Sequence, residues 1–83
     1  MENRPDWWDW ELELTPHLLK RMVDRVFNES DLRTMLEDAI DVQSLSSERY
    51  QVSTMLNEQQ WIVIVEPDPP ERKILIVTAY PCD

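Results

Sequence analysis

The chain has 83 residues, 42% of them apolar, and its eight basic and seventeen acidic side chains give a net charge of −9. This length excludes a second hydrophobic core, and no apolar run approaches the ~20 residues that span a membrane. The charge excludes the broad basic surface with which most nucleic-acid-binding proteins neutralise phosphates, so a role with RNA must overcome this deficit.

The N-terminus and the single cysteine bear on where the protein works. The segment "MENRPDWWDW" carries charges where a secretory signal would be apolar, which indicates an unexported, cytoplasmic protein. Cys82 has no second cysteine with which to form an internal disulfide, and no cysteine and histidine residues have the spacing of a zinc site. We therefore expect no metal and no cofactor.

The first half of the chain predicts one strand and two helices. Residues 10–14, "WELEL", alternate apolar and acidic side chains, as a half-buried strand does. Thr15, followed by a proline, predicts the start of a helix that runs to about Phe27. Ser30 is expected to cap a second helix that ends near Asp41. The apolar stripe of that helix has the spacing i, i+3, i+4, i+7, i+8 and consists of Leu32, Met35, Leu36, Ala39 and Ile40.

The second half predicts three strands after the polar connection at residues 43–48. Residues 49–56 alternate, residues 61–66 are apolar on both faces, and residues 73–80 are nearly as apolar. The doubly apolar segment is expected to be the central strand of an antiparallel meander. Because glycine is absent, Pro, Asn, Asp and Ser must form the turns. The pattern predicts an α+β domain of order β-α-α-β-β-β, with two helices packed on one face of an antiparallel sheet.

Residues 1–9 form a Trp-rich segment ahead of the single predicted domain at residues 10–83. Trp7 and Trp8 could cover the second apolar face of the sheet or form a patch for a partner. We expect the first use, because a sheet with apolar side chains on both faces needs cover. A second copy of the chain would cover any apolar face that remains, pairing through the Trp-rich N-terminus or a sheet edge. The like charges of two copies oppose such pairing, so we expect a weak homodimer.

A helical wheel divides the first helix into two faces. The apolar face, which is expected to be buried, consists of Leu18, Leu19, Met22, Val23, Val26 and Phe27. On the polar face, His17, Arg21 and Arg25 follow one another at four-residue steps, and Lys20 lies nearby. An imidazole can move protons near neutral pH, and guanidinium groups bind phosphate and the charge that develops in phosphoryl transfer. One histidine and two arginines are therefore the smallest set of side chains that we would expect to cleave a phosphodiester without a metal.

The same three residues also have an ordinary interpretation. Arginine and lysine commonly occupy the solvent face of an amphipathic helix, where they pair with nearby carboxylates. Thr78 and Tyr80 place hydroxyls near the end of the last strand, on the face expected to carry Ile76, although both are also common strand formers. Arg49 opens the first meander strand and is expected near the same end of the sheet.

Three segments together resemble a known family. "TPHLLKRMVDRVF", "WIVIVEPD" and "VTAYP" are similar to a set of small bacterial proteins of unknown function with a His-x-x-x-Arg-Met-x-x-Arg helix, over roughly residues 10–81. That family is placed near the barnase–EndoU–colicin–RelE group of metal-independent ribonucleases, many of them toxins of toxin–antitoxin systems. The resemblance implies a RelE-like or microbial RNase-like fold. It also implies a catalytic group that consists of His17, Arg21, Arg25, Thr78 and Tyr80.

The implied reaction is attack by a ribose 2′-OH on the adjacent phosphate, with His17 moving protons and the arginines stabilising negative charge. Arg49 and Lys20 would then contact the RNA. The chain departs from the family at Val26, where glycine is common, and at residues 57–60, which lack the basic residues of the family's first hairpin. Two function classes stay open: a metal-independent endoribonuclease, and a non-catalytic acidic module that binds a protein partner, as an antitoxin or immunity protein binds its toxin.

Overall fold

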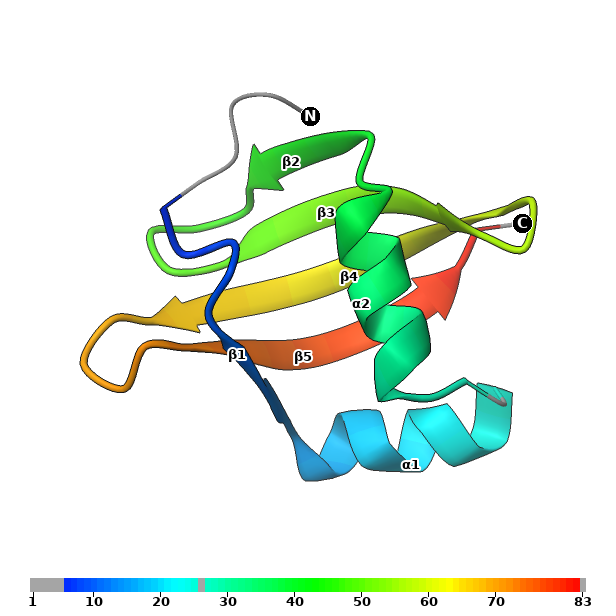
Figure 1. The fold of residues 1–83 in the computed structure, drawn as a ribbon, viewed down its shortest axis with the longest axis horizontal. Coiled ribbons are helices and arrows are strands. Elements are labelled where there is room, and N and C mark those ends of the chain that lie inside the picture. The colour runs from blue at the N-terminus through cyan, green and yellow to red at the C-terminus, as the bar shows by residue number, and fades with distance from the viewer. Residues whose placement is uncertain (1–5, 26, 83) are drawn as a thin grey trace.

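The computed structural model describes residues 6–25 and 27–82, which form two helices and one five-stranded sheet (Figure 1). In chain order the elements are β1 (Glu11–Leu14), α1 (Pro16–Arg25), α2 (Glu29–Glu37), β2 (Asp41–Ser44), β3 (Tyr50–Leu56), β4 (Gln59–Asp68) and β5 (Lys73–Pro81). The α+β class predicted from the sequence is confirmed.

The strands lie in the order β1-β5-β4-β3-β2. β4 has β5 on one side and β3 on the other, both antiparallel to it, so the central position predicted for residues 61–66 is confirmed. The expectation of a purely antiparallel sheet is wrong in one respect, because β1 runs parallel to β5. The sheet is therefore mixed, with β1 at one edge and β2 at the other.

β2 is a strand that the sequence did not predict. α2 ends at Glu37 rather than near Asp41, and Ile40, expected on its buried stripe, is exposed. The backbone N–H of Ile40 donates to the carbonyl of Ser53 at an N···O distance of 2.7 Å, and β2 then pairs with the first half of β3. Of the four residues of β2, only Val42 is partly buried. A strand this short and polar shows no alternating pattern in the sequence. At the edge of the sheet it disfavours pairing with strands of other chains.

Both helices begin at side-chain caps. The Oγ1 atom of Thr15 accepts a hydrogen bond from the backbone N–H three residues later, at 3.1 Å, as predicted. α2 is capped by Asn28 rather than Ser30. The Oδ1 of Asn28 accepts from the backbone N of Asp31 at 2.9 Å, and the Oδ2 of Asp31 accepts from the backbone N of Asn28 at 3.0 Å. Ser30 cannot form this reciprocal capping box, because an arginine lies three residues after it.

α2 packs across the sheet and supplies much of the core, whereas α1 lies beside β5 (Figure 1). Leu32, Met35 and Leu36 of α2 are buried, as predicted. The hydroxyl of Thr54, a buried residue of β3, donates to the backbone carbonyl of Met35 and fixes the helix to the strand.

Fewer side chains of α1 are buried than the helical wheel predicted. Leu18 is fully buried and Met22 partly so, but Leu19 is 49% exposed and Val23 is 78% exposed. Phe27, just beyond the helix, is buried, and Val26 lies outside the described residues. Because α1 lies at the margin of the sheet, only a narrow side of it faces the core, and the wheel could not reveal this position.

The tryptophans of the N-terminal segment complete the core on the helix side. Trp8 is 4% exposed and belongs to the same apolar cluster as Val52 of β3. The ring centroid of Trp7 lies 5.5 Å from that of Trp8 and 5.2 Å from that of Tyr50. Tyr50 and Val52 are two residues apart in β3, so both point toward the helices. The expectation that Trp7 and Trp8 cover the second face of the sheet is therefore wrong.

In the part of the chain that the structure describes, neither helix covers the second face of the sheet. The alternation of β3, β4 and β5 directs five large side chains to this open face: Met55, Ile62, Ile64, Leu75 and Tyr80. Ile62 is buried but does not belong to the helix-side core. The open face therefore has an apolar group of its own, separate from the main core, among polar side chains such as those of Gln51, Ser53 and Glu66.

We predict that Thr15→Ala lowers the free energy of unfolding by about 1–2 kcal/mol, because it removes the α1 cap. The same hydroxyl also donates to backbone carbonyls of β5, so its loss weakens the contact between α1 and the sheet. Urea denaturation of Thr15→Ala beside Thr15→Ser measures the effect. Serine keeps the hydroxyl and should stay within about 0.5 kcal/mol of the natural protein; equal losses from both variants would contradict this role.

The β3–β4 hairpin turns at Asn57 and Glu58, whose φ angles are 51° and 67°. Asparagine tolerates this left-handed region, but glutamate does so at a cost that glycine avoids. We predict that Glu58→Gly raises the free energy of unfolding by about 1 kcal/mol. Gln59→Gly, one residue later in β4, should lower it by roughly 0.5–1 kcal/mol. Thermal denaturation compares the two, and a loss of stability in Glu58→Gly would refute the turn assignment.

Candidate functional site

The outer edge of β5 is covered by two different elements. β1 pairs with residues 73–76 only, and α1 lies along the remainder. The Thr15 hydroxyl donates to the carbonyls of Ile76 and Val77, at O···O distances of 3.1 and 3.3 Å. At the other end of α1, Nη1 of Arg25 donates to the carbonyl of Ala79 at 3.2 Å. Both ends of α1 are thus fixed against the second half of β5.

A β-bulge changes the direction of the hydroxyls of β5. The register between β4 and β5 shifts by one residue, which leaves Val77 as an extra residue. Beyond it Ala79 is buried on the helix side, so Thr78 and Tyr80 point to the open face. The expectation that they share the face of Ile76 is wrong, because the extra residue reverses the alternation of side chains. The bulge contains no glycine, so no pattern in the sequence predicted it.

His17 and Arg21 lie on the side of α1 that turns toward this open face, and Arg25, nearly in line with Leu18, reaches the edge of β5. Met22 packs against the helix-side core, and Arg21 lies on the opposite flank of the buried Leu18. His17 is exposed, and Arg21 and Arg25 are half-buried. We call these three side chains, with Thr78 and Tyr80 of β5, the α1–β5 edge.

The groups of the α1–β5 edge are available for a ligand. Among the described residues, His17 and Arg21 form no side-chain hydrogen bond or ion pair, and Arg25 forms only its bond to Ala79. The carboxylates expected to neutralise the arginines do not do so here; Glu13, for example, pairs with Lys73 at an Nζ···Oε1 distance of 3.6 Å. His17 lies ~12 Å along the helix axis from Arg25, so an extended ligand would be needed to touch both.

Arg49 does not join this group. β3 and β5 run in the same direction because both are antiparallel to β4, so Arg49, at the start of β3, lies where β5 begins. Its expected position near Tyr80 is therefore wrong. Nε of Arg49 forms an ion pair with Oε1 of Glu66 at 3.0 Å. Lys20 is exposed on the outward side of α1, one helical step from Arg21.

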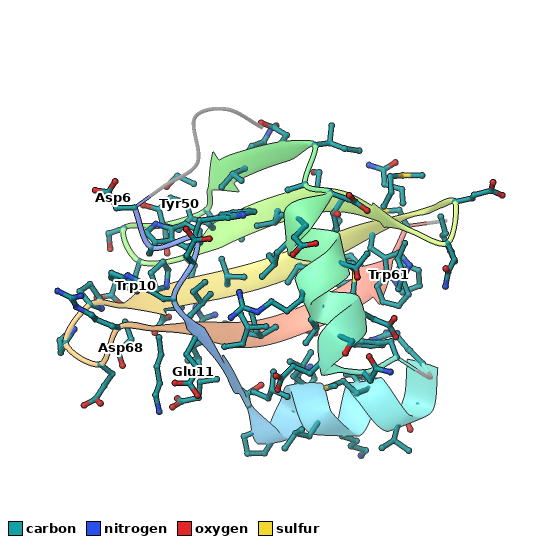
Figure 2. All side chains as sticks on the ribbon, viewed as in Figure 1. Asp6, Trp10, Glu11, Tyr50, Trp61 and Asp68 are labelled. Carbon is teal, nitrogen blue, oxygen red and sulfur yellow. The ribbon has the colours of Figure 1, made fainter. Side chains whose placement is uncertain are left out.

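A cavity of about 560 Å³, which the sequence did not predict, lies at the end of the sheet where Arg49 is found. The rings of Trp7 and Tyr50 line it, together with Glu48 and prolines of the turn after β4. Glu66 and Asp68 border it as well, but the alternation of β4 directs their side chains to the open face; we call the cavity the acidic–aromatic pocket. Figure 2 shows Tyr50 and Asp68 at one end of the molecule and Trp61 at the other. Only the fold brings Trp7 next to Tyr50, which lies far from it in sequence, so no local pattern marks this pocket.

Comparison with protein-family models, with curated proteins and with solved structures found no match. Over residues 6–25 and 27–82, no group of histidine, cysteine, aspartate and glutamate side chains could hold a metal ion. Neither described helix is long and apolar enough to cross a membrane. Function is therefore inferred from the geometry of the chain alone.

Proposed function

We propose that this chain is a small metal-independent endoribonuclease of the RNase-toxin type, and that RNA binds at the α1–β5 edge. The observation that carries the proposal is the hydrogen bond from Arg25 to Ala79, which holds the cationic side of α1 against the end of β5. Thr78 and Tyr80, the neighbours of Ala79 in sequence, point to the face toward which those cations turn. One proton carrier, two guanidinium groups and two hydroxyls thus border one surface.

In this reaction the 2′-oxygen of a ribose attacks the adjacent phosphorus and the bond to the 5′-oxygen breaks, leaving a cyclic phosphate and a 5′-hydroxyl. Arg21, one helical step from His17, holds the reacting phosphate and stabilises its added negative charge, while Arg25, fixed at Ala79, contacts the phosphate of a neighbouring nucleotide. His17 accepts the proton of the 2′-OH. The hydroxyl of Tyr80, 38% exposed, is available to give a proton to the leaving oxygen.

The test is cleavage of total RNA by the purified protein in EDTA. We expect cleavage by the natural chain and a loss of at least about 100-fold in a His17→Ala/Arg21→Ala variant, because both proton transfer and charge stabilisation are removed. Gel electrophoresis of the RNA gives the rate, and circular dichroism checks that the variant is folded.

Arg72→Ala is the matched control, since Arg72 is an exposed cation in the turn before β5, away from the α1–β5 edge. The Arg72→Ala variant should cleave RNA at a rate within about threefold of that of the natural chain, if a local site rather than the overall charge is responsible for cleavage. Background-level loss of RNA with both the natural chain and the double variant would rule out the enzyme.

A non-catalytic acidic binding module is the second candidate. The acidic–aromatic pocket and the net charge of −9 favour a basic protein partner, as an antitoxin or immunity protein would have in its cognate toxin. The ion pair between Arg49 and Glu66 also removes one cation from those that RNA could use. The cleavage assay separates the two candidates, because only the first predicts a rate that depends on His17.

We also propose that the chain forms a weak homodimer. Trp7 and Trp8 are used within the core and β2 is short and polar, so the homodimer forms across the open face, where it covers Tyr80 and competes with RNA. We expect light scattering at high protein concentration and moderate salt to show a dimer, and Ile64→Glu to abolish it. Gln59→Glu adds the same charge at the hairpin and should leave it intact. A monomeric mass for the natural chain under these conditions would exclude the dimer.

A further inference from the structure

We propose that Thr15 is the positioning residue of the α1–β5 edge: its hydroxyl joins the start of α1 to the β-bulge of β5 and so sets the place of His17 relative to Thr78. The role assigned to Thr15 rests on the proposed function, because only a reaction at the α1–β5 edge gives these contacts a catalytic purpose. The contacts themselves belong to the fold and can be tested without RNA.

The hydroxyl of Thr15 takes part in three hydrogen bonds at once. Its Oγ1 accepts from the backbone N–H of Leu18 at 3.1 Å and donates to the carbonyls of Ile76 and Val77, at O···O distances of 3.1 and 3.3 Å. A hydroxyl has one proton, so the two carbonyls share it in a three-centre bond. One oxygen atom thus holds the first turn of α1 and two successive peptide groups of β5. We call this set of bonds the Thr15 clamp.

The bulge brings the two carbonyls to the same edge of the strand. In a regular strand successive carbonyls point to opposite edges, but those of Ile76 and Val77 both reach one atom beyond the outer edge of β5. β1 pairs with β5 only as far as Ile76, which leaves the carbonyl of Val77 beyond the ladder. Backbone groups that a bulge removes from the ladder need another partner. Thr15, the first residue after β1, supplies it.

Different contacts fix the direction of the β5 side chains and the place of α1. Ala79 is fully buried on the helix side, where the ring of Tyr80 would not fit if the register slipped by one residue. Packing therefore decides which side chains of β5 reach the open face. It constrains α1 much less, because Leu18 is the only fully buried side chain of that helix. The place of α1 along β5 is left to the polar contacts at its two ends, the Thr15 clamp and the bond from Arg25.

The Thr15 clamp connects the two backbone segments that carry reacting groups. His17 lies two residues after Thr15, and Thr78 lies one residue after Val77. A change at the clamp therefore moves the imidazole relative to the hydroxyl of β5. Misplacement of a reacting group by about 1 Å can lower a rate by as much as ~100-fold, so a clamp at this point has a large effect on catalysis.

The guanidinium groups depend less on the clamp. Arg25 keeps its own bond to the carbonyl of Ala79, and Arg21 lies between the two ends of α1. Loss of the clamp should therefore leave the binding of phosphate nearly unchanged while proton transfer slows. We expect kcat to fall about tenfold and KM to change by less than about threefold.

The kinetic test is cleavage of a short RNA in EDTA, at a temperature where circular dichroism shows each variant to be folded. Thr15→Ala should lose about tenfold in kcat, and Thr15→Ser, which restores the hydroxyl, should return to within about threefold of the natural chain. Asn28→Ala is the matched control, because it removes the cap of α2 and a similar amount of stability at a different place. It should leave kcat within about twofold of the natural value. Equal losses of kcat from Thr15→Ala and Asn28→Ala would overturn the proposal.

Amide hydrogen exchange followed by NMR tests the clamp without RNA. Thr15→Asp separates its two halves, because aspartate caps a helix as an acceptor but its carboxylate has no proton to donate. We expect the amide of Leu18 to stay protected, whereas the amides of residues 77–79 should exchange at least about tenfold faster relative to those of β3 in the same variant. Unchanged relative exchange at residues 77–79 would overturn the proposal.

The two measurements separate the clamp from the proposed function. A natural chain that cleaves no RNA would refute the ribonuclease, and with it the catalytic purpose of Thr15, even with faster exchange at residues 77–79 of Thr15→Asp. Cleavage that is the same in Thr15→Ala as in the natural chain would refute the role of Thr15 alone.

Discussion

The outer edge of β5 is the constraint on which much of this structure depends. A strand edge presents backbone carbonyls and N–H groups that must be paired or covered. β1 is too short to pair with all of β5, and α1 supplies the remainder through the Thr15 hydroxyl and the Arg25 guanidinium. These polar contacts fix α1 at the margin of the sheet, and that position explains why Leu19 and Val23 stay in solvent.

The two faces of the sheet differ for a related reason. α2, part of α1 and the tryptophans of the N-terminal segment all pack on one face, so the helix-side core is completed within a single chain. The other face keeps apolar side chains without a helical cover. The bulge at Val77 turns Thr78 and Tyr80 toward that second face. A single extra residue thus places two hydroxyls at the border between the open face and the cationic side of α1.

Elements with strong local patterns could be predicted from the sequence. The doubly apolar residues 61–66 predicted a central strand, the stripe of Leu32, Met35 and Leu36 predicted the buried face of α2, and Thr15 followed by proline predicted the start of α1. β2 could not be predicted because its pairing with β3, rather than any pattern of its own, makes it a strand. The bulge and the acidic–aromatic pocket depend on neighbours distant in sequence, so no local signal marked them.

The local cations of α1 and the negative net charge of the whole chain act on a charged ligand over different distances. His17, Arg21 and Arg25 lie along α1, whereas the chain as a whole has a net charge of −9. At very low ionic strength the net negative charge repels polyanions over a long distance, whereas at physiological ionic strength the Debye length falls to about 8 Å and the repulsion beyond it is largely screened. Salt screens that long-range repulsion more than it screens contacts at close range. A polyanion would therefore reach the cationic side of α1 more readily at moderate ionic strength than at very low ionic strength, the reverse of the usual behaviour of basic nucleic-acid-binding proteins.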